Sequence, residues 1–148
     1  MYIHELDDVT LMRGLLRLES EGEPFLGKLA VACVVRNRLR DPRKWWPGKT
    51  WAGIIFQPRQ FSCFNGLDLE APLAGKILSS FVFIDRRALW WKECHYAAWG
   101  IVYDYFGDVT DGANHYCRYD CWPKWRTEAK EASNIPKISV GAHVFYRL

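Results

Sequence analysis

The sequence contains no apolar run of about 18 residues, which is the length that a membrane-spanning helix requires. We therefore expect no insertion into a membrane. Residues 1–8 are polar and acidic, and they lack the basic and then apolar order of a secretion signal. Internal repeats, low-complexity stretches and linkers are also missing, so the 148 residues are expected to form a single domain, 1–148.

Cysteine is present in an odd number, five, and without CxxC spacing. His115, Cys117 and Cys121 resemble half of a zinc site, but such sites normally need four convergent ligands. The spare candidates, Cys63, Cys94 and His95, have no patterned spacing. The simpler interpretation is a set of free thiols in a reducing compartment, with no metal and no cofactor.

The chain also lacks a strong charge of either sign. Its net charge of +3 is far from the dense Lys/Arg footprint of a nucleic-acid-binding protein, so no nucleic-acid partner is expected. A mildly basic surface is compatible with an anionic polymer as partner. Aromatic residues, in contrast, are abundant: 8 Trp, 8 Phe and 7 Tyr. The surplus could stack on sugar rings in a carbohydrate groove, or it could pack a Trp-rich core.

The hydrophobic pattern predicts a mainly α fold with a small β element, of the α+β class. Asp7 and Asp8 precede a helix over residues 9–20, and Pro24 starts a second helix that runs to residue 39. Thr50 is expected to cap a short helix over 51–56. Further helices are expected over 71–83 and 85–106, a short strand or extended loop over 60–66, irregular chain over 108–136, and one terminal strand over 137–146.

Glu19 stands out within the first predicted helix. It follows Leu11 and Leu15 at helical spacing, which places it on the apolar stripe and not on the solvated face. A carboxyl group in such surroundings resists ionisation, so it could act as a general acid near neutral pH. The alternative is an ordinary ion pair with a residue such as Arg38. Glu23 is expected to serve the positive end of the second helix.

Four ordered segments resemble the SleB-like cell-wall hydrolases, a family that includes spore-cortex-lytic enzymes and phage endolysins. The similar segments are LESEGEPFLGKLAVACVVRNR over 18–38, WPGKTWAGIIFQPRQFS over 46–62, GANHY over 112–116, and ISVGAHVFY over 138–146. Residues 67–110 contain no segment that matches the family closely.

The resemblance implies a lysozyme-superfamily fold like that of lytic transglycosylases, with Glu19 as the catalytic acid. Such enzymes cleave peptidoglycan between N-acetylmuramic acid and N-acetylglucosamine, and one carboxyl group can suffice. A hydrolytic muramidase is the alternative, and it would normally need a second carboxylate besides Glu19. Asp68, Asp111 and Asp120 could supply the second by folding into range. A non-catalytic glycan-binding or virion structural module is the other alternative.

The same segments supply candidate substrate-binding residues: Ser20, Gln60, Ser62, His115 and Tyr116. Ser62 and His115 could equally serve structural roles.

Asn37 and Arg38 are expected to be structural, and His143 is expected to be a core histidine. We further expect a monomeric phage endolysin, made in the host cytoplasm without a signal peptide, that reaches the cell wall in the periplasm after release.

Overall fold

The computed structural model describes residues 1–43, 49–58 and 60–148, so residues 44–48 and residue 59 lie outside it. The helices and strands follow one another as η1 (Ile3–Glu5), α1 (Asp8–Ser20), α2 (Phe25–Arg40), α3 (Trp51–Ile55), η2 (Ser62–Phe64), α4 (Gly75–Val82), α5 (Leu89–Val102), β1 (His115–Arg118), α6 (Lys124–Glu131), β2 (Ile138–Val140) and β3 (His143–Tyr146). The predicted class, mainly α with a small β element, is confirmed.

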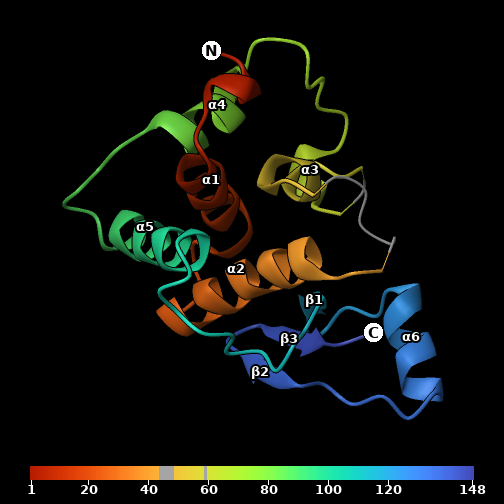
Figure 1. Cartoon of the computed structure of the whole chain (residues 1–148). Coiled ribbons are helices and arrows are strands. Elements are labelled where there is room, and N and C mark those ends of the chain that lie inside the picture. Colours follow the sequence, from red (N-terminus) through yellow and green to blue (C-terminus); the bar gives the residue numbers. More distant parts are fainter. Residues whose placement is uncertain (44–48, 59) are drawn as a thin grey trace.

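Helix α1 is the centre of the helical part, where it packs against α2, α3, α4 and α5 (Figure 1). The side-chain carboxylate of Asp7 caps its first turn by accepting a hydrogen bond of 2.8 Å from the amide of Thr10. Leu11 and Leu15 are buried, as the apolar stripe predicted. This first helix is therefore formed by the local signals that identified it.

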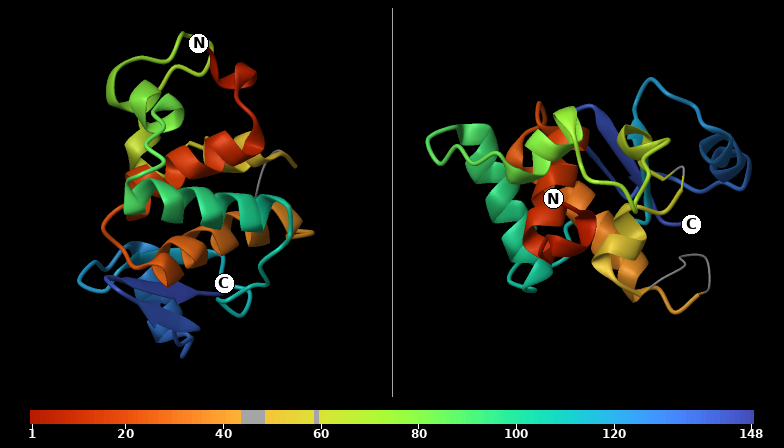
Figure 2. Two further views of the ribbon diagram at one scale, coloured as in Figure 1. Left: turned by 90° about the vertical axis from the view of Figure 1, so that its left-hand side faces the viewer. Right: turned by 90° about the horizontal axis from the view of Figure 1, so that it is seen from above.

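Helix α2 separates α1 and α5 from the β-sheet. Seen from the side, it lies between α1 and α5 above and the sheet below (Figure 2). Every residue from Leu29 to Val35 is buried, because both faces of the helix are covered. Small side chains such as Ala30 and Ala32 allow the close approach of its neighbours.

The sheet has the order β1-β3-β2, and all its pairs are antiparallel. The prediction of one terminal strand over 137–146 is wrong, because the chain turns back at Gly141 and forms the β2–β3 hairpin. Gly141 has a φ of +55°, which favours glycine and ends the extended segment. The irregular region predicted over 108–136 also contains β1 and α6.

The remaining differences concern shorter elements. Residues 62–64 form a 3₁₀ turn in place of the predicted strand or extended loop. The side chain of Asp85 accepts hydrogen bonds from the amides of Arg87 and Ala88, and this turn delays the start of α5. Helix α5 ends at Val102 because Asp104 adopts a φ of +60°, outside the helical region. None of the helices described is long and apolar enough to cross a membrane.

Gly14 of α1 lies close against Phe81 of α4. A Cβ at this position would overlap the ring of Phe81, which is fully buried and cannot move aside. Although alanine favours a helix by about 1 kcal/mol over glycine, overpacking typically costs about 1–3 kcal/mol or more. We therefore expect Gly14→Ala to lower the free energy of unfolding by about 2 kcal/mol in urea denaturation. Gly107→Ala meets no atom within 4 Å and is the matched control; equal stabilities would contradict this packing.

Candidate active site

A cleft of about 1110 Å³ lies where the end of α1 meets the sheet. Its volume exceeds the range of about 300–1,000 Å³ that is typical of small-ligand pockets, so it suits part of a larger molecule. Its described lining comes from the α1–α2 turn, the segment around η2, helix α4, strand β1 and the β2–β3 turn. These residues are Arg17, Leu18, Glu19, Ser20, Glu21, Gly22, Glu23, Pro24, Arg38, Gln60, Ser62, Cys63, Lys76, Ser79, Ser80, Tyr116, Cys117, Arg118, Gly141, Ala142 and His143.

Glu19 lies in this cleft at the last turn of α1, and it is half-buried. Its Oε2 accepts a hydrogen bond of 2.7 Å from the hydroxyl of Tyr116 on β1. Burial, and then the neighbouring carboxylate, raise the pKa of Tyr116 well above its ordinary value of 10, so the hydroxyl keeps its proton and donates it. The structure thus brings together two of the candidate residues that are far apart in the sequence.

Arg38 forms the cleft wall close to this pair. It is buried, its Nε donates a hydrogen bond of 2.8 Å to the carbonyl of Asn114, and its guanidinium lies over the ring of Phe61. Burial lowers the pKa of Arg38 to about 10, although the charges of Tyr116 and Glu19 oppose this, and the group stays charged at neutral pH. Arg38 therefore combines the expected structural role with a place in the cleft.

The segment around η2 supplies the opposite wall. Gln60 and Ser62 line the cleft there, as the sequence predicted, and the Ser62 side chain is exposed to it. Cys63 lines it as well. Burial and the neighbouring Glu19 carboxylate raise the pKa of the Cys63 thiol to about 12, so it stays protonated. No pattern in the sequence placed a cysteine beside Glu19.

Two candidate residues have other engagements. Ser20 lines the cleft, but it is buried and its hydroxyl donates a hydrogen bond of 2.7 Å to the carbonyl of Leu16. His115 is not among the described residues of the cleft, since alternation along β1 directs it away from Tyr116. Its Nδ1 lies 2.8 Å from Oδ1 of Asn114, and its ring contacts Trp125 of α6.

The β2–β3 turn contributes residues that the sequence interpretation placed elsewhere. His143 is buried, as expected for a core histidine, but it also lines the cleft. Glu23 does not turn back onto α2: its carboxylate accepts the amide of Ala142 at 3.2 Å. The pairing of β1 with β3 puts His143 opposite Arg118. Because Arg118 is two positions from Tyr116, these side chains lie on the same face of the sheet, and no local pattern reveals this register.

The acidic side chains of the described cleft are Glu19, Glu21 and Glu23. Asp68, Asp111 and Asp120, which were considered as second carboxylates, are not among its described residues.

The sequence left open whether the surplus tryptophans line a carbohydrate groove or pack the core. Two of the eight tryptophans fall within residues 44–48, and none of the other six lines the described part of the cleft. Trp91, for example, stacks on the ring of His95 and contacts the guanidinium of Arg13.

Asn37 has the structural role that was predicted. Its side-chain amide donates to Asp108, Thr110 and the carbonyl of Ala113, which fixes the segment before β1.

In the described ranges no group of three or more His, Cys, Asp or Glu side chains could hold a metal ion.

A family model with the description Cell Wall Hydrolase matches residues 22–146. The chain belongs to this family. The match begins just after Glu19 and includes the other cleft segments from α2, η2, α4 and the sheet. The membership confirms the resemblance that the four sequence segments indicated.

Solved structures show the same fold for this cell wall hydrolase domain. The catalytic domain of the germination-specific lytic transglycosylase SleB from Bacillus anthracis is similar with a TM-score of 0.66 and 24% identity, over 95% of this chain and 93% of that one. The catalytic domain of Bacillus cereus SleB gives a TM-score of 0.65 and 24% identity, over 99% and 93%.

Among curated proteins, the spore cortex-lytic enzyme of Bacillus cereus is 43% identical over 56 residues, which is 38% of this chain and 20% of that protein. The spore cortex-lytic enzyme of Bacillus subtilis is 38% identical over 56 residues, which is 38% of this chain and 17% of that protein. The chain thus matches about a fifth of the length of these relatives.

The environment of His115 on β1 predicts that the stability of the protein depends on pH. Burial, together with the charges of Arg38 and Arg43, lowers the pKa of His115 from 6.5 to about 4. As pH falls from 6.5 to 4, the unfolded chain takes up a proton that the native protein excludes, so stability is lost over this window. For a partly exposed ring we expect a loss of about 2 kcal/mol. Urea denaturation of the wild type and His115→Gln at pH 7 and pH 4 measures it, and parallel losses in both proteins would refute it.

Proposed function

We propose that this member of the cell wall hydrolase family is a lytic transglycosylase that cleaves the bond between N-acetylmuramic acid and N-acetylglucosamine in peptidoglycan. The observation that carries the proposal is the position of Glu19: a half-buried carboxyl group on the wall of a large cleft, oriented by the Tyr116 hydroxyl. A carboxyl group held in this way is suited to move a proton to and from a bound sugar. The similar SleB domain of Bacillus anthracis is the catalytic domain of a lytic transglycosylase, which supports the same chemistry for this chain.

In the proposed reaction Glu19 acts first as acid and then as base. The protonated carboxyl group donates its proton to the glycosidic oxygen, and the bond from that oxygen to C1 of the muramic acid breaks. The resulting carboxylate accepts the proton of the muramoyl 6-hydroxyl, whose oxygen then bonds to C1. The products are a free 4-hydroxyl on the leaving sugar and a 1,6-anhydro ring, and no water is consumed.

The surroundings of Glu19 support this double role. The hydroxyl of Tyr116 donates to one carboxylate oxygen, Oε2, and so orients the carboxyl group in the cleft. We further propose that Gln60 and Ser62, on the opposite wall, bind hydroxyl or acetamido groups of the glycan. Ser20 and His115 were predicted to take part, but the engagement of Ser20 with Leu16 and the position of His115 outside the described cleft favour structural roles.

Hydrolysis is the second candidate function, and it is favoured by the other two glutamates of the cleft. An inverting hydrolase needs a second carboxylate that activates water. Glu21, however, lies 3.9 Å from Arg17, and Glu23 accepts the Ala142 amide. Since both carboxylates have protein partners, the single-acid reaction is the better supported.

Three finer expectations stay predictions that rest on the sequence alone. They are the role of a phage endolysin, the monomeric state, and action on the cell wall after release from a host cell. The alternative of a non-catalytic glycan-binding or virion structural module is tested by the substitution of Glu19.

Glu19→Gln is the direct test of the proposal. The amide has nearly the same shape but cannot supply the proton, so we expect the rate of wall lysis to fall by about 10²–10⁴-fold. The free energy of unfolding should change by no more than about 1–2 kcal/mol. Glu128→Gln on the exposed face of α6 is the matched control and should keep wild-type activity. Full lysis by Glu19→Gln would eliminate the proposed mechanism.

The products distinguish the two chemistries. Purified peptidoglycan digested by the wild-type protein should yield muropeptides with 1,6-anhydro ends, which are lighter by one water than those with reducing ends. Mass spectrometry separates the two forms. Predominantly reducing ends would assign the protein to the hydrolytic muramidases.

A further inference from the structure

Glu23 is held through its backbone and its carboxylate. Its amide donates to the carbonyl of Ser20 at 2.9 Å, which ties it to the end of α1. Its own carbonyl accepts a hydrogen bond from the ammonium group of Lys28, a lysine that is 2% exposed. Both backbone groups of Glu23 are thus fixed, and its side chain starts from a defined point between α1 and α2.

The carboxylate of Glu23 bridges from there to the β2–β3 turn. Both of its oxygens lie 3.2 Å from the amide of Ala142. Gly141 makes this approach possible, because a Cβ at that position would overlap Oε2 of Glu23. The left-handed turn of Gly141 and the length of the Glu23 side chain therefore fit one another.

From the turn, a series of contacts leads through His143 to Tyr116 and Glu19. Oε1 of Glu23 lies 3.4 Å from Nδ1 of His143, and both side chains are nearly buried. The His143 ring packs edge-on against Tyr116 with 5.1 Å between ring centroids. Tyr116 in turn donates to Glu19. Burial lowers the pKa of His143 against the opposing effect of Glu23, so the ring is neutral at pH 7 and acts here through its shape and position.

We propose that Glu23 is a positioning residue: by holding the β2–β3 turn beside His143, it keeps Tyr116 where its hydroxyl orients Glu19. The inference rests on the proposed role of Glu19 as acid and base. It gives the last glutamate of the Glu-Ser-Glu-Gly-Glu-Pro segment a function that depends on its reach and its acceptor oxygen and not on proton transfer.

Two substitutions separate reach from charge. Glu23→Gln loses the charge but keeps the length and an oxygen for the Ala142 amide, whereas Glu23→Asp keeps the charge and is too short to reach it. With soluble glycan strands as substrate, we expect Glu23→Gln to retain kcat within about 3-fold and Glu23→Asp to lose about 10-fold or more, with KM unchanged in both. Glu128→Gln and Glu128→Asp on α6 are the matched controls. The reverse order, with Asp active and Gln inactive, would show that Glu23 works as a charged catalytic group and would overturn the proposal.

A double-mutant cycle with Tyr116→Phe tests the path. If Glu23 acts through Tyr116, Glu23→Asp should cost little further kcat once the hydroxyl is gone, so the two losses are not additive. Additive losses would overturn the proposal. Thermal melting of each variant checks folding, and if Glu23→Asp does not fold, Gly141→Ala displaces the same carboxylate and replaces it in the cycle.

Glu19→Gln is assayed in parallel to keep the two proposals apart. An inactive Glu19→Gln protein combined with additive losses at Glu23 and Tyr116 refutes the positioning role alone. An active Glu19→Gln protein refutes the proposed function, and the positioning role with it.

Discussion

The hydrogen bond from Tyr116 to Glu19 is the interaction on which the cleft depends. It joins the last turn of the first helix to the first strand of the sheet, two elements separated by nearly the whole helical part of the chain. Such a bond is only as well placed as the strand that presents the tyrosine. The ring of Tyr116 stacks on Phe145 and meets His143, so β3 fixes it from two sides. The position of the Glu19 carboxyl group thus depends on sheet pairing.

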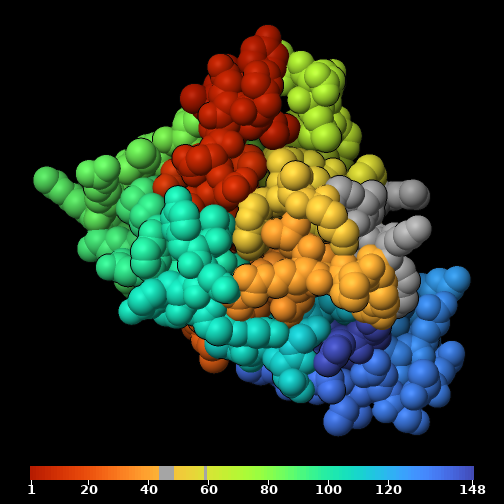
Figure 3. All heavy atoms as spheres, in the orientation of Figure 1, coloured from red at the N-terminus to blue at the C-terminus, as the bar shows by residue number. Residues whose placement is uncertain are grey.

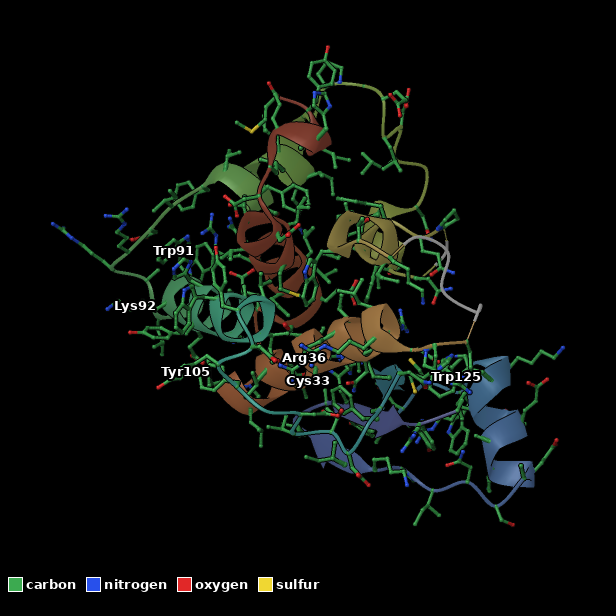
Figure 4. The ribbon with its side chains drawn as sticks, viewed as in Figure 1. Cys33, Arg36, Trp91, Lys92, Tyr105 and Trp125 are labelled. Atoms are coloured by element: carbon green, nitrogen blue, oxygen red, sulfur yellow. The ribbon has the colours of Figure 1, made fainter. Side chains whose placement is uncertain are left out.

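Helix α2 makes that sheet pairing possible, because it carries the side chains that secure the approach to β1. Arg36 donates hydrogen bonds to Asp104 and to the carbonyl of Phe106. In Figure 4 Arg36 lies on α2, and Tyr105 extends from the segment that follows α5. Asn37 and Arg38 bind the next stretch of chain down to Asn114. On the face shown in Figure 3 the surface of α5 and of the segment after it adjoins that of α2. Three consecutive residues of α2, Arg36, Asn37 and Arg38, therefore hold in place the roughly ten residues of irregular chain that lead into the sheet.

The sequence was informative where structure follows from local signals, and misleading where it follows from distant pairing. The Asp7 cap, the Leu11 and Leu15 stripe and the Thr50 cap predicted their helices because each acts within a few residues. Strand β1 was missed because its four residues have no alternation of their own and become a strand only by pairing with β3. The same cause hid Glu23 and His143, since their contact depends on the hairpin at Gly141. Of the predicted site residues that line the described cleft, Glu19 was indicated by its helical spacing, whereas Ser20, Gln60, Ser62 and Tyr116 required the family resemblance.

The three glutamates at the end of α1 and in the turn after it have the same chemistry but different partners, and this difference decides what each can do. Glu21 is about half exposed and lies near Arg17, in a pair that solvent screens. Glu23 is nearly buried, and its oxygens accept a main-chain amide. Glu19 is held by the neutral hydroxyl of Tyr116, and such a donor can keep the carboxyl group in place whether it is protonated or ionised. A partner that tolerates both states is the requirement for a single group that must first give a proton and then take one back.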